Sequence, residues 1–339
     1  MPVRVPSAAS ALTEPYETAR EEMPRPGGNI GCHMNGVHEQ VVAADLGGTW
    51  MRAAVVSSDG ACGPLTRRPT AAARPQEELT ADLVALVQET QAQARLERGR
   101  VSGLAVASAT VPDRAGRIRF APNLATLEGV NLRSRLEQVL GLPVTMANDA
   151  SCFALGEWWM GAGKGSANLC GITLGTGIGV GIVIGGRLYE GSHGYAGEIW
   201  NTPMEGSFLE HLVCGAAIER HYQRLSGRTL GGAEIAGLAD RGDEAARGAF
   251  AEFGRSLGAV VSFLVNLLDP EVAVFGGAIA SSFRHFRQPV AETLAATTTR
   301  GSGTRLEASA LGEAGTLLGA AKTFWEGRGR DPAHGCAAG

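Results

Sequence analysis

Short apolar runs alternate along the chain with longer stretches in which apolar residues recur every third or fourth position. The short runs predict β-strands, and the helical periodicity predicts amphipathic helices. The expected strands cover 41–45, 50–57, 102–108, 143–147, 169–174, 178–184 and 271–275. The expected helices cover 77–98, 131–140, 150–160, 207–225, 243–268 and 313–326. This alternation predicts an α/β protein in which helices are layered on sheets.

Two segments share one pattern of apolar positions. VVAADLGGTWMRAAVV at 41–56 and LCGITLGTGIGVGIVI at 169–184 both have a strand, a Leu-Gly turn and a second strand, so that Asp45 corresponds to Thr173. Two diverged copies of one domain, with a cleft between them, would produce this pattern. Two hairpins that are similar by chance would also produce it. The pattern alone leaves both interpretations open.

Composition and charge narrow the class of protein. Hydrophobic residues make up 44% of the 339 residues and charged residues 19%, as in ordinary soluble proteins. The formal net charge of −4 argues against a nucleic-acid-binding surface. No stretch approaches the ~20 consecutive apolar residues of a membrane span, and residues 1–39 lack the apolar core of a secretory signal. We therefore expect neither nucleic acid nor membrane as a partner.

The cysteines and the chain ends give further expectations about compartment and flexibility. The six cysteines are scattered without a CxxC pair, which is typical of reduced thiols in the cytoplasm. Residues 1–39 are rich in Pro, Gly, Ala and Glu and are expected to form a flexible extension, and 327–339 a flexible tail. Met23 and Met34 leave open a later start of translation than Met1.

The two glycine turns are candidate phosphate loops. Consecutive backbone amides can bind phosphate without cationic side chains, and glycine permits the close approach. The turns at 46–49 and 175–177 have this composition, but no lysine follows either one and neither opens directly into a helix. A P-loop and a Rossmann turn are therefore poor fits. One such turn alone favours an ordinary hairpin, whereas two at matching positions favour phosphate binding, with Asp45 holding Mg²⁺ through water.

Other polar residues have both a structural and a chemical interpretation. Asn148 and Asp149 follow a short strand and precede a helix, so they suit N-capping, but an aspartate there could also accept a proton from a hydroxyl. Glu198 and Glu210 could bind adjacent hydroxyls of a polyol or could be solvated surface charges. Gly276-Gly277 could lie against a flat ring or could form a sharp strand-to-helix turn.

Taken in order, these stretches resemble the ROK family of sugar kinases, within the actin, Hsp70 and hexokinase superfamily. The resemblance runs from about Val41 to about Trp325. The motifs that carry it are DLGGTWMR (45–52), APNL (121–124), ANDA (147–150), ITLGTGIGVGIVIGG (172–186), AGEI (196–199), FLEHL (208–212) and VFGGAIA (274–280). It implies two actin-like (ribonuclease H-like) α/β domains with a cleft between them. The smaller lobe would comprise 40–147 plus 311–326, and the larger lobe 148–310.

The resemblance also implies roles for individual residues. Asp149 would be the general base that takes a proton from a primary hydroxyl, and Asp45 would lie near Mg²⁺. The phosphates of ATP would be bound by Gly47, Gly48, Thr49, Thr176 and Gly177, and its adenosine by Gly276 and Gly277. The remaining hydroxyls of the sugar would be bound by Asn123, Asn148, Glu198 and Glu210. Homodimers are common in the family.

One motif departs from the family pattern. Many members follow Gly-Glu-Ile with Gly-His and then close a structural zinc site with a CxCGxxGC run. Here Trp200 and Asn201 follow Ile199, and MEGSF at 204–208 replaces the cysteines. We predict no zinc site. Because the family histidine reaches the anomeric side of the sugar, Asn201 or Trp200 in its place makes glucose a less secure substrate.

These observations predict an ATP- and Mg²⁺-dependent kinase that phosphorylates the primary hydroxyl of a hexose or a hexose-like C7-cyclitol. Polyphosphate is an alternative donor. The competing hypothesis is a non-catalytic ROK-type regulator that senses sugar. Residues 1–39 are too short and too rich in Pro and Gly for a winged helix, and the presence of both Asp45 and Asp149 favours an enzyme.

Overall fold

The computed structural model describes residues 39–96, 101–298 and 303–328. The predictions for 1–38 and 329–339, including the alternative starts at Met23 and Met34, and for positions 97 and 98 of the first expected helix therefore lie outside the described residues. The expected strands are confirmed to within one residue at each end. Most of them belong to two five-stranded sheets.

The first sheet has the strand order β3-β2-β1-β4-β7. Its strands are β1 (Gln40–Leu46), β2 (Trp50–Ser57), β3 (Thr66–Pro69), β4 (Val101–Ser108) and β7 (Val144–Asn148). The β1–β2 and β2–β3 pairs are antiparallel, and β4 is parallel to both β1 and β7. The carboxyl ends of β1, β4 and β7 thus meet at one edge of the sheet.

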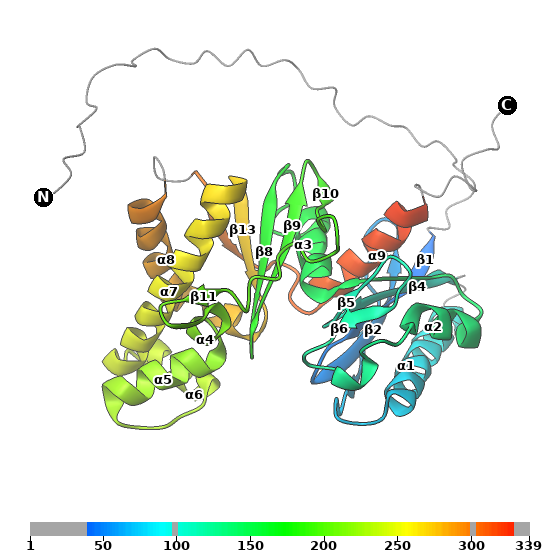
Figure 1. Ribbon diagram of the computed structural model, residues 1–339, viewed down its shortest axis with the longest axis horizontal. Helices are drawn as coiled ribbons and strands as arrows, with labels where there is room; N and C mark the ends of the chain where they lie inside the picture. Colours follow the sequence, from blue (N-terminus) through cyan, green and yellow to red (C-terminus); the bar gives the residue numbers. More distant parts are fainter. Residues whose placement is uncertain (1–38, 97–100, 299–302, 329–339) are drawn as a thin grey trace, which may run out of the picture. The chain divides into compact units, whose positions relative to one another are not determined.

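Alternating side chains along β1 pack on opposite faces of this sheet. Val42, Ala44 and Leu46 belong to a core shared with α1 (Gln76–Leu96) and α2 (Leu132–Leu140). Val41 and Ala43 pack instead with α9 (Ala314–Arg328). Both faces are therefore covered by helices, which explains why β1 is apolar at nearly every position (Figure 1).

The second sheet repeats this arrangement with the order β10-β9-β8-β13-β14. Its strands are β8 (Leu169–Leu174), β9 (Ile178–Ile184), β10 (Arg187–Leu188), β13 (Val272–Gly276) and β14 (Arg305–Ala308). An antiparallel three-stranded unit again continues into two parallel strands. Because strand order and orientation both recur, the shared sequence pattern reflects a repeated unit rather than two hairpins that are similar by chance.

Helices cover both faces of the second sheet. One face packs against α5 (Gly215–Ser226), α6 (Gly232–Asp240), α7 (Glu244–Leu268) and α8 (Phe283–Thr297). In Figure 1, α7 and α8 run side by side next to β13. By length and composition α7 could span a membrane, but most of it is buried inside the protein, as in a core helix. The other face packs against α3 (Asp149–Met160).

Helices α3 and α9 approach each other closely enough to exclude side chains. A Cβ atom on Gly156 would lie 2.0 Å from the carbonyl oxygen of Gly315, and one on Gly319 would lie 1.7 Å from that of Cys152. Because α3 also packs on β8 and β9 while α9 packs on β1 and β4, this backbone contact joins the two sheets.

A buried carboxylate fixes the segment that leads into α9. Glu157, on α3, has no exposed surface. Its two oxygens accept hydrogen bonds from Ser309 Oγ and from the backbone amides of Ala162, Ala310 and Leu311. The buried charge is thus paired entirely with dipoles at the point where the chain passes from β14 to α9.

The expected helix at 207–225 is wrong as one continuous element. The chain instead forms a small hairpin of β11 (Pro203–Met204) and β12 (Ser207–Phe208), then α4 (Leu209–Leu212) and α5. Cys214 between the two helices has an extended backbone, with φ −103° and ψ 173°, so the helix cannot continue through it.

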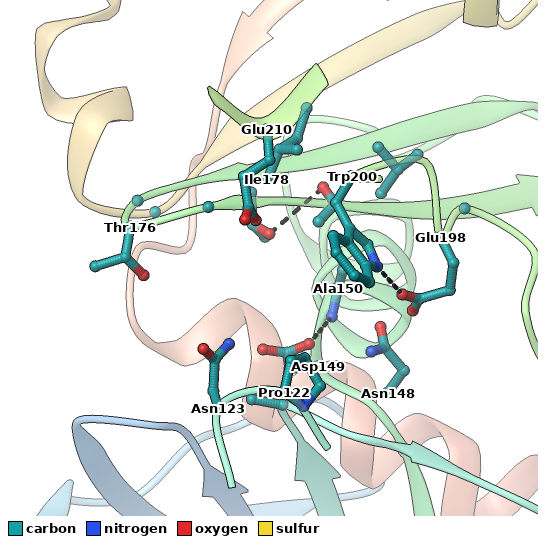
Figure 2. Close-up of a pocket in the computed structure, with 18 of the residues that line it drawn as sticks. Pro122, Asn123, Asn148, Asp149, Ala150, Thr176, Ile178, Glu198, Trp200 and Glu210 are labelled. Atoms are coloured by element: carbon teal, nitrogen blue, oxygen red, sulfur yellow. Dashed lines mark hydrogen bonds between the residues drawn. The ribbon is translucent and has the colours of Figure 1, made fainter. Parts of the chain in front are cut away.

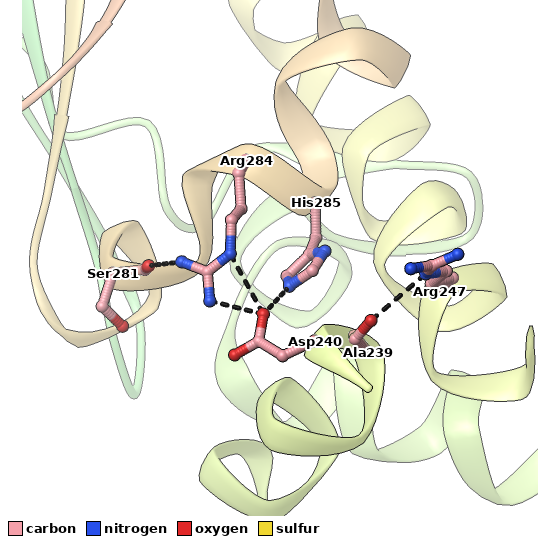
Figure 3. Close-up of polar contacts among 6 residues, drawn as sticks. All are labelled: Ala239, Asp240, Arg247, Ser281, Arg284 and His285. Carbon is pink, nitrogen blue, oxygen red and sulfur yellow. Dashed lines mark hydrogen bonds and ion pairs between the residues drawn. The ribbon is translucent and has the colours of Figure 1, made fainter. Parts of the chain in front are cut away.

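Several elements were not expected from the sequence. They are β3, β10, β14, α6 and α8, together with the β5 (Val111–Pro112)–β6 (Ile118–Phe120) hairpin, η1 (Ala125–Leu127) and η2 (Ala278–Ser282). Figure 3 shows how α6 is attached to α8: the carboxylate of Asp240 accepts hydrogen bonds from Arg284 and from His285 Nε2, the latter at 2.6 Å. Arg284 also donates to the carbonyl oxygen of Ser281 in η2, so one polar cluster connects three elements.

Candidate active site

A cavity of about 280 Å³ lies at the carboxyl ends of the central strands. This volume is just below the range of small-molecule sites, which run from roughly 300 to 1,000 Å³. Figure 2 shows Asp149 between Asn123 and Asn148, with Thr176, Glu198, Trp200 and Glu210 around the remaining sides. Of the residues selected from the sequence, those that line the cavity are Asn123, Asn148, Asp149, Thr176, Gly177, Glu198, Glu210 and Gly277.

Asn148 and Asp149, at the start of α3, have different roles: one caps the helix and the other faces the cavity. Asn148 is the N-cap, because its side-chain oxygen accepts a hydrogen bond from the Ser151 amide at 3.1 Å. The carboxylate of Asp149 accepts a hydrogen bond from the adjacent Ala150 amide at 2.8 Å and points into the cavity (Figure 2). The capping interpretation is thus confirmed for Asn148, and the carboxylate of Asp149 is left free to contact a ligand.

The environment of Asp149 favours its neutral form. Burial, followed by the negative charge of Asp45 and a weaker contribution from Glu198, raises the pKa of Asp149 to about 7. Hydrogen bonding by the Ala150 amide opposes this shift. A carboxyl group with this pKa can both accept and release a proton near neutral pH, as a general base must.

Asp45 lies at the end of β1, outside the residues that line the cavity. Its Oδ2 is 3.0 Å from Arg52 Nη1, and Arg52 also reaches Glu313 at 3.4 Å. Burial raises the pKa of Asp45 to about 6 even though the Arg52 charge and hydrogen bond lower it. The last turn-side residues of the strand therefore include a carboxylate whose charge Arg52 compensates only in part.

The first glycine turn adjoins the cavity through Asn123. A Cβ atom on Gly48 would lie 3.1 Å from Asn123 Cβ, so the backbone of the turn contacts a side chain that lines the cavity. The Gly47 amide donates to the carbonyl oxygen of Trp50 at 3.1 Å, and the side chain of Thr49 is exposed. None of these three turn residues lines the cavity itself.

The second glycine turn forms part of the cavity wall. A Cβ atom on Gly177 would lie only 2.1 Å from Glu210 Oε2, so a side chain here would displace this carboxylate from its present position. Gly277 also lines the cavity and has φ +82°, a conformation that glycine adopts without strain. Gly276 does not line the cavity, and its Cα faces the ring of Phe153.

Trp200 lines the cavity, whereas Asn201 is exposed and does not. The indole Nε1 donates to Glu198 Oε2 at 2.9 Å, and the indole stacks on Phe120 with ring centroids 5.6 Å apart and an interplanar angle of 11°. From the sequence, Asn201 and Trp200 were named together at the place of the family histidine, but only Asn201 was selected as a binding residue, and Phe120 was not considered. The signal for Trp200 was its position two residues after Glu198; Phe120 had none beyond its proximity to the APNL motif.

The described residues contain no group of three His, Cys, Asp or Glu side chains placed to hold a metal ion. The absence of zinc stays a prediction. For Mg²⁺, the chemistry of the available donors is suitable, because Asp45 raises the pKa of Asp149 and both carboxylates are hard oxygen ligands. A divalent cation near them would relieve this repulsion. Mg²⁺ binding therefore stays a prediction that the residues fit.

The sequence model of the ROK family matches residues 41–326. The chain belongs to the ROK family. This match spans both sheets and every motif in which the resemblance was found.

Relatives of this ROK protein include carbohydrate kinases. A glucokinase from Streptomyces coelicolor is 29% identical over 266 residues, covering 70% of this chain and 82% of that protein. A β-glucoside kinase from Listeria monocytogenes is 31% identical over 255 residues, covering 71% and 83%. The crystal structure of a ROK glucokinase from Streptomyces griseus, in complex with glucose and AMPPNP, superimposes with a TM-score of 0.74 at 26% identity, covering 84% of this chain and 98% of that one.

The structural match confirms the predicted fold class, two actin-like α/β domains. The domain boundaries at 147/148 and 310/311, and the roles of the individual site residues, stay predictions.

Proposed function

We propose that this ROK protein is a kinase that transfers the terminal phosphoryl group of ATP to the primary hydroxyl of a hexose or a hexose-like C7-cyclitol. The proposal rests on the position of the Asp149 carboxylate. It does not cap helix α3, since Asn148 does, and it faces a cavity that asparagine and glutamate side chains line. The glucose and AMPPNP bound to the Streptomyces griseus relative support the same pairing of sugar and nucleotide.

Asp149 is proposed as the general base. In the reaction the acceptor oxygen forms a bond to the γ-phosphorus, its proton passes to the carboxylate, and the bond between the γ-phosphorus and the β,γ-bridging oxygen breaks to release ADP. The transition state of phosphoryl transfer is loose, so the position of the base matters more than its strength. A pKa of about 7 suits this proton transfer because the group can return the proton to water after product release.

The remaining polar side chains of the cavity are proposed to hold the acceptor. Glu198 and Glu210 offer carboxylate oxygens to hydroxyl groups, and Asn123 and Asn148 offer amides. Four such groups around one small cavity can orient a polyol so that a single hydroxyl faces Asp149. The cyclitol remains a candidate because it carries a similar hydroxymethyl group.

ATP is proposed to bind across the glycine-rich segments. Gly47, Gly48, Thr49, Thr176 and Gly177 would hold the phosphates and Gly276 and Gly277 the adenosine, as in the family pattern. Asp45 would hold Mg²⁺ through water, and the bound cation would neutralise charge on the phosphates. The close packing at Gly48 and Gly177 supports this arrangement, because a Cβ atom there would press on Asn123 and on Glu210.

The competing hypothesis is a sugar-sensing regulator without catalysis. Retention of both Asp45 and Asp149 favours the kinase, since a sensor needs neither a base nor a metal ligand. Cytoplasmic location and a homodimeric state are expectations that accompany the kinase proposal, and polyphosphate remains a possible alternative donor.

One assay tests the kinase proposal. Purified protein with Mg²⁺ and ATP, or with Mg²⁺ and polyphosphate, is offered a panel of hexoses and cyclitols, and formation of ADP and of the phosphorylated acceptor is measured. At least one acceptor should be phosphorylated. Asp149→Asn should lower kcat by about 10²–10⁴-fold while calorimetry still detects sugar binding, and Asp82→Asn, a matched change on α1 outside the cavity, should leave kcat unchanged. Unchanged turnover in Asp149→Asn would contradict the base assignment, and specific DNA binding without turnover would favour the regulator.

A further inference from the structure

Trp200 is the residue through which the two glutamates of the cavity are connected. Its indole Nε1 donates to Glu198 Oε2 at 2.9 Å, and its carbonyl oxygen accepts a hydrogen bond from the Glu210 amide at 3.0 Å. Figure 2 shows both bonds extending from this residue. The indole therefore holds the Glu198 carboxylate directly, whereas Glu210 is bound through the backbone of residue 200 and would keep that bond whatever the side chain at this position.

The indole itself is held by a second aromatic ring. Phe120 comes from β6, which pairs with β5 through Val111, and its ring stacks nearly parallel on the indole at a centroid distance of 5.6 Å. Both rings line the cavity. Stacked aromatic pairs contribute beyond the area they bury, and an indole fixed by stacking and by a hydrogen bond has little rotational freedom. Together the two rings make a rigid wall on the side of Glu198.

The two rings affect the protonation of Glu198 and limit the space beside it. Burial raises the pKa of Glu198, and the hydrogen bond from Trp200 opposes this shift and so favours the ionised form. An ionised carboxylate with one oxygen engaged by the indole has its other oxygen available for a hydroxyl of the acceptor. Because Glu198 and Trp200 line the same cavity, an acceptor bound by that oxygen would bring a neighbouring ring position against the indole.

We propose that Trp200 positions Glu198 and, together with Phe120, selects acceptors that carry nothing larger than a hydroxyl at the ring position next to the one bound by Glu198. The proposal rests on the proposed kinase function. The acceptors selected in this way are free hexoses and unsubstituted cyclitols. Rejected are rings that carry an alkyl ether, a glycosidic group or an acylamino group at the position facing the indole.

The proposal is tested with glucose and three substituted forms that sample three ring positions: a methyl glucoside, N-acetylglucosamine and 3-O-methylglucose. Binding is measured by calorimetry without ATP, and kcat and KM are measured with ATP where turnover occurs. The wild-type protein should bind glucose, or another unsubstituted ring, at least tenfold more tightly than at least one of the substituted forms. Trp200→Ala should raise the affinity for that rejected form relative to the unsubstituted ring by at least tenfold.

Two milder variants separate the hydrogen bond from the wall. Trp200→Phe keeps a ring against Phe120 but loses the Nε1 donor, so the KM of the unsubstituted acceptor should rise about tenfold while kcat changes less than threefold. Phe120→Leu keeps the donor but removes the stack, so it should relax the discrimination with a smaller effect on KM. Trp159→Phe, on the far end of α3, and Phe208→Leu, an exposed ring of β12, are matched controls outside the cavity and should change neither quantity.

The outcomes distinguish this proposal from the kinase proposal. Absence of turnover with every acceptor would remove the kinase function, but the binding comparison would still decide the role of Trp200. Equal binding of all four sugars by the wild-type protein, or the same discrimination in Trp200→Ala as in the wild type, would overturn the proposal even if the protein is a kinase. If Trp200→Ala does not fold, Phe120→Leu supplies the same comparison.

Discussion

The two hairpins β1–β2 and β8–β9 have the same topology but make different contributions to the site. In the first, buried Asp45 is the next-to-last residue of the strand, and the glycine turn does not line the cavity, although Gly48 lies against Asn123. In the second, Thr173 occupies the corresponding position, and the turn lines the cavity directly, against Glu210. The repeated backbone thus supplies two similar turns. They differ in the polar residues near them and in whether they line the cavity. Under the proposed function, this division would place Mg²⁺ at the first copy and a larger share of the acceptor contacts, through Glu210, at the second.

The largest effect is expected from exchanging the polar residues at the corresponding positions. Asp45→Asn should lower kcat/KM by about 10²–10³-fold and weaken the dependence of activity on Mg²⁺ concentration, because the amide keeps the shape but loses the charge. Thr173→Val should have a far smaller effect, since the threonine, although it lines the cavity, carries no charge and its hydroxyl donates to the Gly179 carbonyl oxygen at 3.4 Å. Steady-state kinetics over a range of Mg²⁺ concentrations measure both. Equal losses of kcat/KM in Asp45→Asn and Thr173→Val would contradict the different roles of the two hairpins.

An intermediate effect is expected from adding a methyl group to each turn. In Gly177→Ala the new Cβ would displace the carboxylate of Glu210, so the acceptor KM should rise about tenfold to a hundredfold without loss of folding, because the displaced group is the end of a flexible side chain. In Gly48→Ala the methyl group would press on Asn123 at 3.1 Å, and the rise should be smaller. Acceptor KM and the unfolding temperature are measured for both variants. A larger rise in Gly48→Ala would reverse the assignment of the acceptor side.

The smallest effect concerns stability and pH. The pKa of Asp149 is raised in the folded protein from 3.8 to about 7, so the folded state binds its proton more tightly than the unfolded state. Stability therefore falls as pH rises from about 4 to about 7 and is level above. Asp149→Asn removes this penalty. Since the side chain is only partly buried and faces an open cavity, the variant should melt about 2–4 °C higher than the wild type at pH 8, with no difference below pH 4.

Asp240 provides the control of opposite sign for that measurement. Hydrogen bonds from Arg284 and His285 lower the pKa of this carboxyl group in the folded protein. Its stabilising contribution is therefore present above its unfolded pKa of about 4 and is lost as pH falls through the folded value. Asp240→Asn should lower the melting temperature at neutral pH by a small amount, with the difference vanishing in acid. Differential scanning fluorimetry without Mg²⁺ or nucleotide measures both variants, and a lower melting temperature for Asp149→Asn at pH 8 would contradict the assignment of its environment.

Much of the fold could be predicted because the buried strands are nearly continuous apolar runs. Strands such as β1 and β13 are apolar on both faces, and the sequence marks them clearly. Helix α8 escaped prediction because Pro289 lies inside it and its apolar positions are diluted by arginine and threonine. The break before α5 could not be predicted either, since Cys214 has no intrinsic preference for the extended conformation that ends α4.

The candidate site was predicted less completely than the fold, for a geometric reason. Sequence proximity shows that Asn148 and Asp149 stand at a helix start, but only the hydrogen bond to the Ser151 amide shows which of them is the cap. Trp200 and Asn201 are adjacent in the chain, yet one lines the cavity and the other is exposed to solvent. Which of two neighbours faces a ligand depends on the path of a loop, and no periodicity encodes that path.

The contact between α3 and α9 has a consequence for mutational surveys of this protein. At Gly156 and Gly319 an added methyl group would meet a carbonyl oxygen of the other helix, which cannot move aside as a side chain can. These positions carry no reactive group, yet they should tolerate fewer substitutions than Asp149, whose replacement by asparagine is expected to leave a folded protein. A screen that scores only growth would not distinguish substitutions at Gly156, Gly319 and Asp149. A screen that also measures the amount of folded protein in the cell would separate loss of folding from loss of activity.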